Sequence, residues 1–484
     1  MNGKRRIGMV GLGVMGRNLA LNAADHGFSV AGFDTDARKR DEAIGLAGDR
    51  PVQVCPSLAN LVDALAVPRA VLLMVPAGPP VDAVIGQLLP ILGSGDCIID
   101  GGNSFYKDTD LRAQAAGAAG INYLGVGISG GERGARSGPS IMPGGPADAY
   151  GHVRPVFEAI AAAVSGEPCV GYLGPGSAGH YVKMVHNGIE YGLLQLIAES
   201  YDLLKRGLGL SDDELADTFA AWNETELGGY LIEITARIFT ERDDKTGERL
   251  IDVILDEARQ KGTGKWTSQD AMDLQVPLPT VDAAVAARHL SMNKDERLRI
   301  AGVIHGQERR FIGERELFLV NTRNALHAAT IVTFAQCMAL LRTASKVYAY
   351  GLRLEEIARI WRGGCIIRTR LLERIREAFQ AEPDIPNILL QGEIGGEVSG
   401  RRQALGWVAH TAADLGIPAP AFMASLAYVD GCASPWLPAN LIQAQRDYFG
   451  AHTYERTDSR GAFHTEWQSD GNNHQDNNDH ARPS

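Results

Sequence analysis

The chain has 484 residues and a net charge of −11, from 47 basic and 58 acidic side chains. This length predicts two or three domains, and the acidic balance argues against a nucleic-acid-binding protein, which usually carries a strong basic excess. Hydrophobic residues make up 45% and charged residues 22% of the chain, as in a globular protein rather than a disordered one.

The six cysteines are far apart and show no Cys-x-x-Cys or zinc spacing. We therefore expect neither a disulfide framework nor a structural metal, and a reducing cytoplasm fits this usage. No uninterrupted apolar run approaches the roughly 18 residues that a membrane span needs, so no membrane association is expected.

The first third of the chain alternates short apolar runs with glycine turns and segments of helical spacing. Strands are predicted at Ile7–Val10, Ser29–Phe33, Ala70–Val75 and Cys97–Asp100. Strands that alternate with helices at this spacing predict a parallel sheet of βαβ units, and hence an α/β Rossmann-type domain over residues 1–178.

From His180 to about Ala433 the strand signals fade and helical periodicity dominates. Helices are predicted at Tyr181–Leu208, Asp212–Trp222, Leu231–Phe239, Asp282–Ala287 and Asn324–Tyr350. We expect a large all-α domain over 179–436 and an extended C-terminal tail over 437–484. The end of this tail, Asp470–Ser484, is mostly Asn, Asp, His and Gln and is predicted to be disordered.

A glycine-rich turn follows the first predicted strand and opens a helix. It reads Gly11, Leu12, Gly13, Val14, Met15 and Gly16. In this strand–turn–helix setting the first glycine permits the tight turn, the second lets the backbone approach a pyrophosphate, and the third permits close helix packing. The turn therefore predicts a dinucleotide site, although the same pattern alone also occurs in purely structural turns.

Asp34 ends the second predicted strand, about 20 residues after the glycine turn. An acidic residue at this place accepts hydrogen bonds from the adenosine ribose hydroxyls and repels a 2′-phosphate. The alternative interpretation is a turn or capping aspartate.

A more specific pattern lies in the first long predicted helix. Its polar residues recur at i, i+3, i+4, i+7 and i+8, which places them on one helical face: Lys183, His186, Asn187, Glu190 and Tyr191. The other faces are apolar. An ordinary solvated stripe seldom combines these residue types, so the pattern favours a ligand-facing role.

Several loops mix glycine with polar groups that suit anionic ligands. They are Asp100-Gly101-Gly102-Asn103-Ser104, Ser129-Gly130-Gly131, Gly138-Pro139-Ser140 and Lys261-Gly262-Thr263-Gly264-Lys265. The last one lacks the spacing of a nucleotide P-loop. Each loop alone is weak evidence for a site, and their joint occurrence is what counts.

With these residues identified, the chain closely resembles the decarboxylating 6-phosphogluconate dehydrogenase family in its long form, from residue 7 to about residue 467. The matching segments, in order, are GLGVMGRNLALN, IIDGGNS, GISGGERGARSGPSIMPGG, GHYVKMVHNGIEYG, QKGTGKWTSQDA, IWRGGCIIR and LPANLIQAQRDYFGAHTYER.

The resemblance implies a reaction of the pentose phosphate pathway. The substrate 6-phosphogluconate is oxidised at C3 by hydride transfer to NAD(P) and loses C1 as carbon dioxide, which gives ribulose 5-phosphate. The matching motif implies that Lys183 is the general base for the C3 hydroxyl and that Glu190 protonates C1 of the enediol. His186 and Asn187 would orient the sugar hydroxyls and the forming keto oxygen.

The same resemblance implies the remaining substrate contacts. Asn103, Ser129, Gly130 and Gly131 would hold the carboxylate end beside the nicotinamide. The phosphate would be bound by Tyr191, Lys261, Arg288 and Arg446, and His452 also matches a substrate contact. Because the family takes the last two residues from the other subunit, a homodimer with shared active sites is implied.

The predicted chemistry needs no metal ion, because hydrogen bonds and a protonated Lys183 can stabilise the enolate that forms as carbon dioxide leaves. A lysine is a base near neutral pH only when burial or nearby cations lower its pKa. Lys261, Arg288 and Arg446 are candidate cations.

The sequence departs from the family at the cofactor. Most members carry Asn-Arg-Thr after the second strand, where the Arg holds the 2′-phosphate of NADP, whereas this chain has Asp34, Thr35 and Asp36. Where the family has a Val-Lys-Ala-Gly loop, this chain has Val75, Pro76 and Ala77, so the lysine is replaced by Pro76 and a second cation is missing. We predict a preference for NAD over NADP, with NADP as the alternative if Arg38, Lys39 or Arg40 compensates.

Two other functions fit part of the sequence. A related β-hydroxyacid dehydrogenase, such as one acting on hydroxyisobutyrate, shares the glycine turn and the catalytic lysine, but it is shorter and lacks the cationic loop and the tail. A non-catalytic dinucleotide-binding protein is the other alternative, since a fold does not prove a function. Phe105, where the family often has an acidic residue, has no explanation in the sequence.

Overall fold

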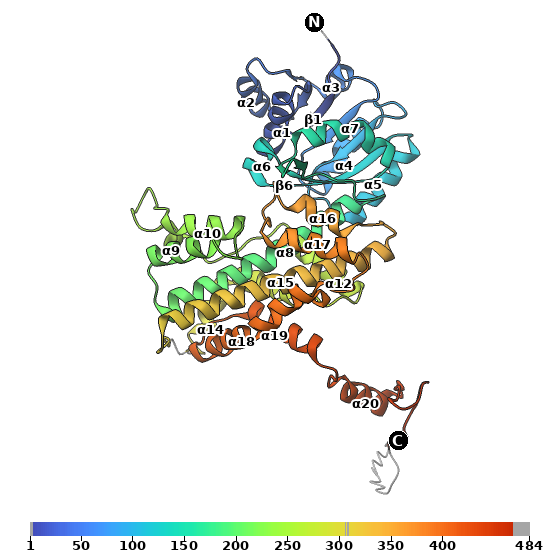
Figure 1. The fold of residues 1–484 in the computed structure, drawn as a ribbon. Coiled ribbons are helices and arrows are strands. Elements are labelled where there is room, and N and C mark those ends of the chain that lie inside the picture. The colour runs from blue at the N-terminus through green and yellow to red at the C-terminus, as the bar shows by residue number, and fades with distance from the viewer. Residues whose placement is uncertain (1–2, 305, 307–308, 468–484) are drawn as a thin grey trace, which may run out of the picture. The chain divides into compact units, whose positions relative to one another are not determined.

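The computed structural model describes residues 3–304, 306 and 309–467 (Figure 1). The expectation for Asp470–Ser484 lies outside these residues. The chain forms two compact units, Met1–Ala427 and Tyr428–Ser484.

The N-terminal domain of the first unit is built on one twisted sheet. Its strands are β1 (Ile7–Val10), β2 (Val30–Phe33), β3 (Val52–Val54), β4 (Ala70–Leu73), β5 (Cys97–Asp100), β6 (Asn122–Ser129) and β7 (Ser140–Gly144). Their spatial order is β3-β2-β1-β4-β5-β6-β7, and every pair is parallel except β6 with β7. The predicted strands and Rossmann-type fold are confirmed.

Helices cover both faces of this sheet, because successive strand residues point to opposite sides and are apolar on both. Met9 joins one buried cluster and Val10 the other. The first cluster includes α1 (Val14–Asp25), α6 (Gly131–Ser137) and α7 (Ala147–Ile160), and the second includes α3 (Leu58–Ala64), α4 (Pro79–Leu88) and α5 (Tyr106–Ala118). Helix α2 (Ala37–Ala47) also joins the first cluster, through Ala43.

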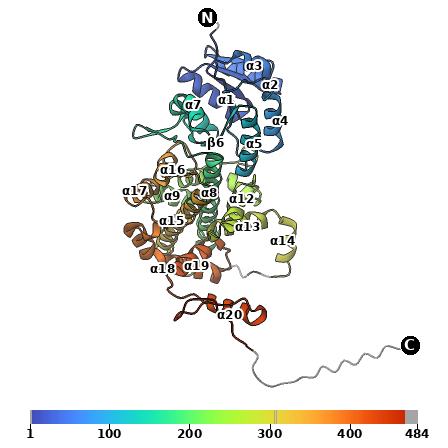
Figure 2. The same ribbon diagram turned by 90° about the vertical axis from the view of Figure 1, so that its right-hand side faces the viewer.

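The helical domain is organised around two long helices, α8 (Ala178–Asp202) and α15 (Arg315–Val347), which pack side by side (Figure 2). A π-helical turn, Leu203–Leu208, extends α8. The other helices are α9 (Asp212–Asn223), α10 (Tyr230–Thr240), α11 (Leu250–Val253), α12 (Thr263–Asp273), α13 (Pro279–Ser291), α14 (Lys294–Ala301), α16 (Leu354–Trp361), α17 (Leu371–Ala381), α18 (Gly392–Leu415) and α19 (Pro420–Ala433). The expected all-α domain is confirmed.

Helix α15 is long and apolar enough to cross a membrane by length and composition, the one such helix among the described residues. However, 83% of its most apolar stretch is buried inside the protein. A core helix of a globular domain gives the same pattern.

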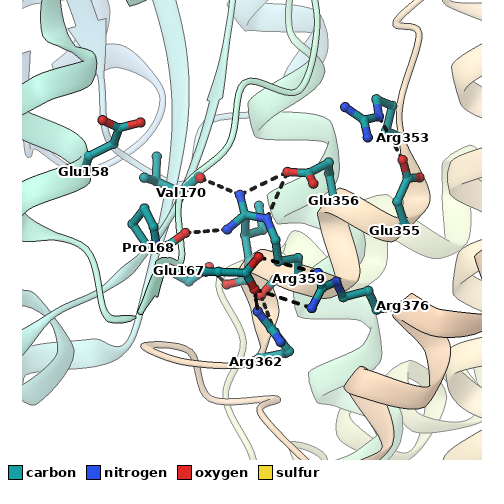
Figure 3. A network of polar contacts seen from close by, with 12 residues as sticks. Glu158, Glu167, Pro168, Val170, Arg353, Glu355, Glu356, Arg359, Arg362 and Arg376 are labelled. Carbon is teal, nitrogen blue, oxygen red and sulfur yellow. Dashed lines mark hydrogen bonds and ion pairs between the residues drawn. The ribbon is translucent and has the colours of Figure 1, made fainter. Parts of the chain in front are cut away.

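Arginines join the two domains through the short hairpin β8 (Ala163–Val164) and β9 (Glu167–Pro168) (Figure 3). Arg359 of α16 donates to the carbonyls of Pro168 (2.6 Å) and Val170 (2.9 Å). Arg362 and Arg376 pair with Glu167 and Glu373. These contacts hold the loop between α16 and α17 against the sheet, where the amide of Ser140 donates to the carbonyl of Gly364 (2.8 Å).

The second unit contains α20 (Ala439–Gly450) and a returning segment that reaches Trp467. Tyr454 and Phe463 exchange backbone hydrogen bonds of 2.8 Å, which closes a loop between them.

Candidate active site

The glycine turn connects β1 to α1 at the carboxyl edge of the sheet. Gly11 has φ +94°, a left-handed conformation that favours glycine. A Cβ on Gly16 would lie 1.9 Å from the Gly11 carbonyl oxygen, so the helix can pack on the turn only without that side chain. A Cβ on Gly13 would meet nothing within 4 Å. The turn thus presents backbone and a helix N-terminus, as a pyrophosphate requires.

Asp34 fastens this turn to the end of β2. Its buried carboxylate accepts from the amide of Leu12 (2.8 Å) through Oδ2 and from that of Asp36 (2.9 Å) through Oδ1. The turn-stabilising interpretation of Asp34 therefore applies. Each carboxylate oxygen has a second lone pair, so ribose binding is compatible with these contacts.

The basic residues beside this loop are already engaged with it. Arg40 donates to the carbonyls of Asp34 (2.7 Å) and Thr35 (3.2 Å). Lys39 Nζ lies 3.9 Å from Asp34 Oδ2, and Arg38 pairs with Asp36 at 3.4 Å. The chain's own acceptors thus compete with a 2′-phosphate for all three cations.

The strand order reverses between β1 and β4, which is where open α/β sheets bind ligands. Val75, Pro76 and Ala77 follow β4 at this edge, and the exposed Asn103 follows β5.

Asp100 is a residue whose role the sequence analysis missed. It is fully buried and accepts from the amide of Gly102 (3.0 Å) and from Ser104 Oγ (2.6 Å), and it lies 3.6 Å from Arg112 Nη1. It therefore shapes the loop that presents Asn103. The strand-ending position of Asp100 was the available signal.

The polar stripe of α8 is buried rather than solvated, except for Glu190, which is half-buried. Lys183 Nζ donates to Asn187 Oδ1 (2.8 Å) and lies 3.4 Å from His186 Nδ1. His186 Nε2 is 3.2 Å from Ser129 Oγ at the end of β6. The structure thus brings Ser129 together with the predicted stripe.

A glycine in β6 allows α8 to come this close. A Cβ on Gly127 would lie 2.3 Å from Lys183 Cβ. Real side chains do not approach so closely, so any larger residue would push the helix from the sheet.

Burial controls the charges in the stripe. It lowers the pKa of Lys183 to about 8, although the nearby Glu190 carboxylate acts in the opposite direction. Burial also lowers the pKa of His186 well below its ordinary value, and the Lys183 ammonium adds to this. Burial raises the pKa of Glu190, against the opposing effect of Lys183 and Arg288. Burial, rather than the proposed neighbouring cations, is thus the main cause of the low Lys183 pKa.

Three of the residues predicted to bind phosphate are Tyr191, which belongs to the stripe, Arg288 and Lys261. The Arg288 guanidinium stacks 3.5 Å from the centre of the Tyr191 ring. A Cβ on Gly264 would lie 2.3 Å from that ring, so the start of α12 packs directly on Tyr191. The exposed Lys261 precedes α12.

Helix α12 contributes residues that the sequence analysis did not assign. Asn187 Nδ2 donates to Thr263 Oγ1 (3.1 Å), which fixes the amide that accepts from Lys183. The ring of Trp266 lies 5.0 Å from that of Phe105. Phe105 thus joins the loop after β5 to α12, which accounts for an aromatic residue at this position. The KGTGK pattern contains Thr263 but did not reveal its contact with Asn187, and it does not include Trp266.

The end of α16 and the loop after it lie in the segment IWRGGCIIR, which only the family resemblance singled out. The Trp361 ring packs edge-on against His186, with centroids 5.5 Å apart. A Cβ on Gly130, which has φ +117°, would lie 2.5 Å from the Gly364 carbonyl oxygen. The end of α16 therefore supports the stripe, and the loop after it supports the neighbouring Ser129–Gly131 turn.

The last predicted site residues, Arg446 and His452, lie in the second unit, and both are exposed there. Among the described residues, no group of three or more His, Cys, Asp or Glu side chains is arranged to hold a metal ion. Metal independence remains a prediction.

Comparisons with known proteins match both domains. Residues 6–174 match the family model of the NAD binding domain of 6-phosphogluconate dehydrogenase, and residues 179–467 match that of its C-terminal domain. The NADP(+)-dependent, decarboxylating 6-phosphogluconate dehydrogenase of Bacillus subtilis is 52% identical over 96% of this chain and 99% of its own length. The decarboxylating enzyme of Escherichia coli K12 is 50% identical over the same shares.

A solved structure has the same fold. The Plasmodium falciparum 6-phosphogluconate dehydrogenase, described in its apo form, with its cofactor NADP+ and with its substrate 6-phosphogluconate, superposes with a TM-score of 0.92 at 42% identity. The match covers 95% of this chain and all of that one.

Proposed function

The chain belongs to the 6-phosphogluconate dehydrogenase family, and we propose that it converts 6-phospho-D-gluconate to D-ribulose 5-phosphate and carbon dioxide with reduction of NAD(P). The observation that carries this proposal is Lys183. It is a buried lysine with a pKa near 8, held by Asn187 and His186 at the dinucleotide-binding edge of the sheet. Such a lysine can exchange a proton with a hydroxyl near neutral pH.

The residues of the glycine turn fit a nicotinamide dinucleotide. When bound, NAD(P)+ accepts the hydride that leaves C3 of the substrate. Gly11, Gly13 and the N-terminus of α1 would hold the pyrophosphate, and Asp34 would contact the ribose. Asn103, Ser129, Gly130 and Gly131 would hold the substrate's carboxylate end next to the nicotinamide.

Lys183 is the proposed general base and Glu190 the proposed acid. Neutral Lys183 takes the proton of the C3 hydroxyl as C3 is oxidised to a ketone. The resulting ammonium returns this proton to the keto oxygen while the C1–C2 bond breaks and carbon dioxide leaves. Glu190 then protonates the former C2 of the enediol, and Lys183 takes back the hydroxyl proton. The raised pKa of Glu190 supports an acid at this place.

We further propose that NAD is preferred over NADP. The support is local: Asp34 places a carboxylate at the ribose end, Thr35 supplies no positive charge, and the three nearby cations are engaged with the loop itself. The Bacillus subtilis relative is named for NADP(+), so NADP dependence is the alternative for this chain.

The substrate phosphate is the proposed ligand of Tyr191, Lys261 and Arg288. In the partner of a homodimer, Arg446 of the tail, residues 437–484, would complete this phosphate site, and His452 would add a further substrate contact. Their exposure on a separate unit of the chain supports this role.

The test is an initial-rate assay of purified protein with 6-phosphogluconate and equal concentrations of NAD or NADP, read by the absorbance of reduced nicotinamide and by trapped carbon dioxide. We expect both signals and a higher kcat/KM with NAD. Higher kcat/KM with NADP would overturn the cofactor proposal alone. Turnover of 3-hydroxyisobutyrate instead would favour the β-hydroxyacid alternative, and cofactor binding without turnover would favour a non-catalytic role.

A further inference from the structure

The two tail residues proposed to reach the partner's substrate lie on an internal polar framework of the second unit. Arg446 and His452 are exposed on either side of Asp447, which is 0% exposed. Two flexible side chains that bind one substrate lose rotamer freedom, and this loss is smaller when they are held in place beforehand. Whatever holds this pair therefore affects substrate affinity.

Asp447 is the centre of the framework. Its carboxylate accepts four hydrogen bonds: from the amide of Thr453 (2.9 Å), His464 Nδ1 (2.9 Å), the amide of Thr465 (3.1 Å) and Trp467 Nε1 (2.8 Å). Burial alone would raise the pKa of this carboxyl, but these donors hold it well below its ordinary value. An ionised carboxylate thus ties α20 to the turn that follows it and to the returning segment.

The turn after α20 has an unfavourable backbone conformation that needs such support. Ala451 has φ +47° and Thr453 has φ +63°, a region that residues with a Cβ rarely adopt. The Thr453 amide is one of the donors to Asp447. A Cβ on Gly450 would lie 2.7 Å from His452 Nε2, so the imidazole folds back over the helix end.

Gln443, one helical turn before Asp447, connects the two exposed residues. Its Nε2 donates to the Thr453 carbonyl (2.6 Å), and its Oε1 accepts from Arg446 Nη1 (3.2 Å). The amide therefore links the guanidinium to the turn that carries His452.

We propose that Asp447 and Gln443 are positioning residues that pre-form Arg446 and His452 as a pair for the substrate. This proposal rests on the proposed function, in which the tail completes the partner's site. Neither residue touches the reacting atoms, so both act through substrate binding. Their loss should raise KM for 6-phosphogluconate and change kcat little.

The test compares Asp447→Asn and Gln443→Leu in the full-length protein with the double variant Arg446→Ala/His452→Ala. Asp458→Asn is the matched control, because Asp458 is an exposed carboxylate of the same unit that pairs with Arg456. KM and kcat are measured together with the oligomeric mass by light scattering. We expect KM to rise about tenfold for Asp447→Asn and about threefold for Gln443→Leu, with kcat within about twofold.

A double-mutant cycle separates positioning from general support of the fold. If Asp447 acts through the pair, Asp447→Asn should raise KM no further once Arg446 and His452 are alanine. An undiminished effect in that background overturns the proposal, as does a wild-type KM in both single variants. If Asp447→Asn changes the oligomeric mass, the cycle is run with Gln443→Leu and decides in the same way.

The controls separate this proposal from the proposed function. No turnover of 6-phosphogluconate by the wild type refutes the proposed reaction. Turnover with an unchanged KM in the Arg446→Ala/His452→Ala variant refutes the tail's substrate role, and the positioning proposal with it. If KM rises in the Arg446→Ala/His452→Ala variant but in neither Asp447→Asn nor Gln443→Leu, the tail keeps its substrate role and only the positioning proposal is refuted.

Discussion

The glycine turn after β1 and the polar stripe of α8 both depend on glycine, but they depend on different parts of the chain. The turn offers backbone amides, and its conformation depends on Gly11 and Gly16 within it and on Asp34 at the end of the adjacent strand β2. The stripe offers side chains whose protonation is set by burial, and that burial comes from β6, α12 and the end of α16. Substitutions in the turn or at the end of β2 should therefore disturb the first region, and substitutions in β6, α12 or α16 should disturb the second.

The largest effect is expected at the centre of the stripe. Lys183→Met removes the proposed base, and kcat should fall by about 10³-fold, within the range of general base catalysis. Lys346→Met, an exposed lysine at the end of α15, is the control. Lys183→Arg keeps the charge but cannot supply a neutral base, so near-normal activity in that variant would contradict the assignment.

Glu190→Gln should slow a later step, by about 10²-fold in kcat. Because Glu190 is proposed to act after oxidation, stopped-flow absorbance should still detect a rapid first turnover of reduced nicotinamide before the slow steady state. An equally slow first turnover would place Glu190 at the oxidation step instead.

Cofactor choice tests the region formed by the glycine turn and the end of β2. The double variant Asp34→Asn/Thr35→Arg adds a guanidinium for the 2′-phosphate, and charge-assisted hydrogen bonds contribute about 1.5–3 kcal/mol. The ratio of kcat/KM for NADP to that for NAD should therefore rise by about tenfold to 10²-fold. Asp49→Asn, at an exposed aspartate just after α2, should leave the ratio near its wild-type value.

The pH profile tests the stripe without a substitution. Lys183 must be neutral to accept a proton, and its pKa is about 8. At low substrate concentration, kcat/KM should fall about tenfold for each pH unit below that value, because the protonated fraction grows. A profile that stays flat well below pH 8 would show that no group with this pKa limits the rate.

The smallest effect is expected from a substitution that changes the packing between β6 and α8 and leaves the proposed catalytic side chains unchanged. Gly127→Ala places a methyl group against Lys183, and overpacking of this kind destabilises a protein by about 1–3 kcal/mol. Gly86→Ala in α4 is the matched control, because its Cβ meets nothing within 4 Å and alanine favours a helix. Urea unfolding should separate the two variants, and kcat should fall only in Gly127→Ala. Equal stability would mean that β6 and α8 adjust without strain.

Sequence reasoning was most reliable where a signal is local. The strands Ile7–Val10 and Cys97–Asp100 were predicted with their observed bounds. The short strand β3 and the long strand β6 were not predicted. Three residues of β3 are too few for a periodic signal, and glycines interrupt the apolar pattern of β6.

The sequence by itself determined the order of strands and helices, the family and the spacing that puts Lys183, His186 and Asn187 on one helical face. Only the tertiary structure decided that this face is buried, that Ser129 and Thr263 complete it, and that Asp447 organises the exposed pair in the tail. The physical reason is range. Helical periodicity and turn conformation depend on neighbouring residues, whereas desolvation and hydrogen-bond partners come from segments far away along the chain.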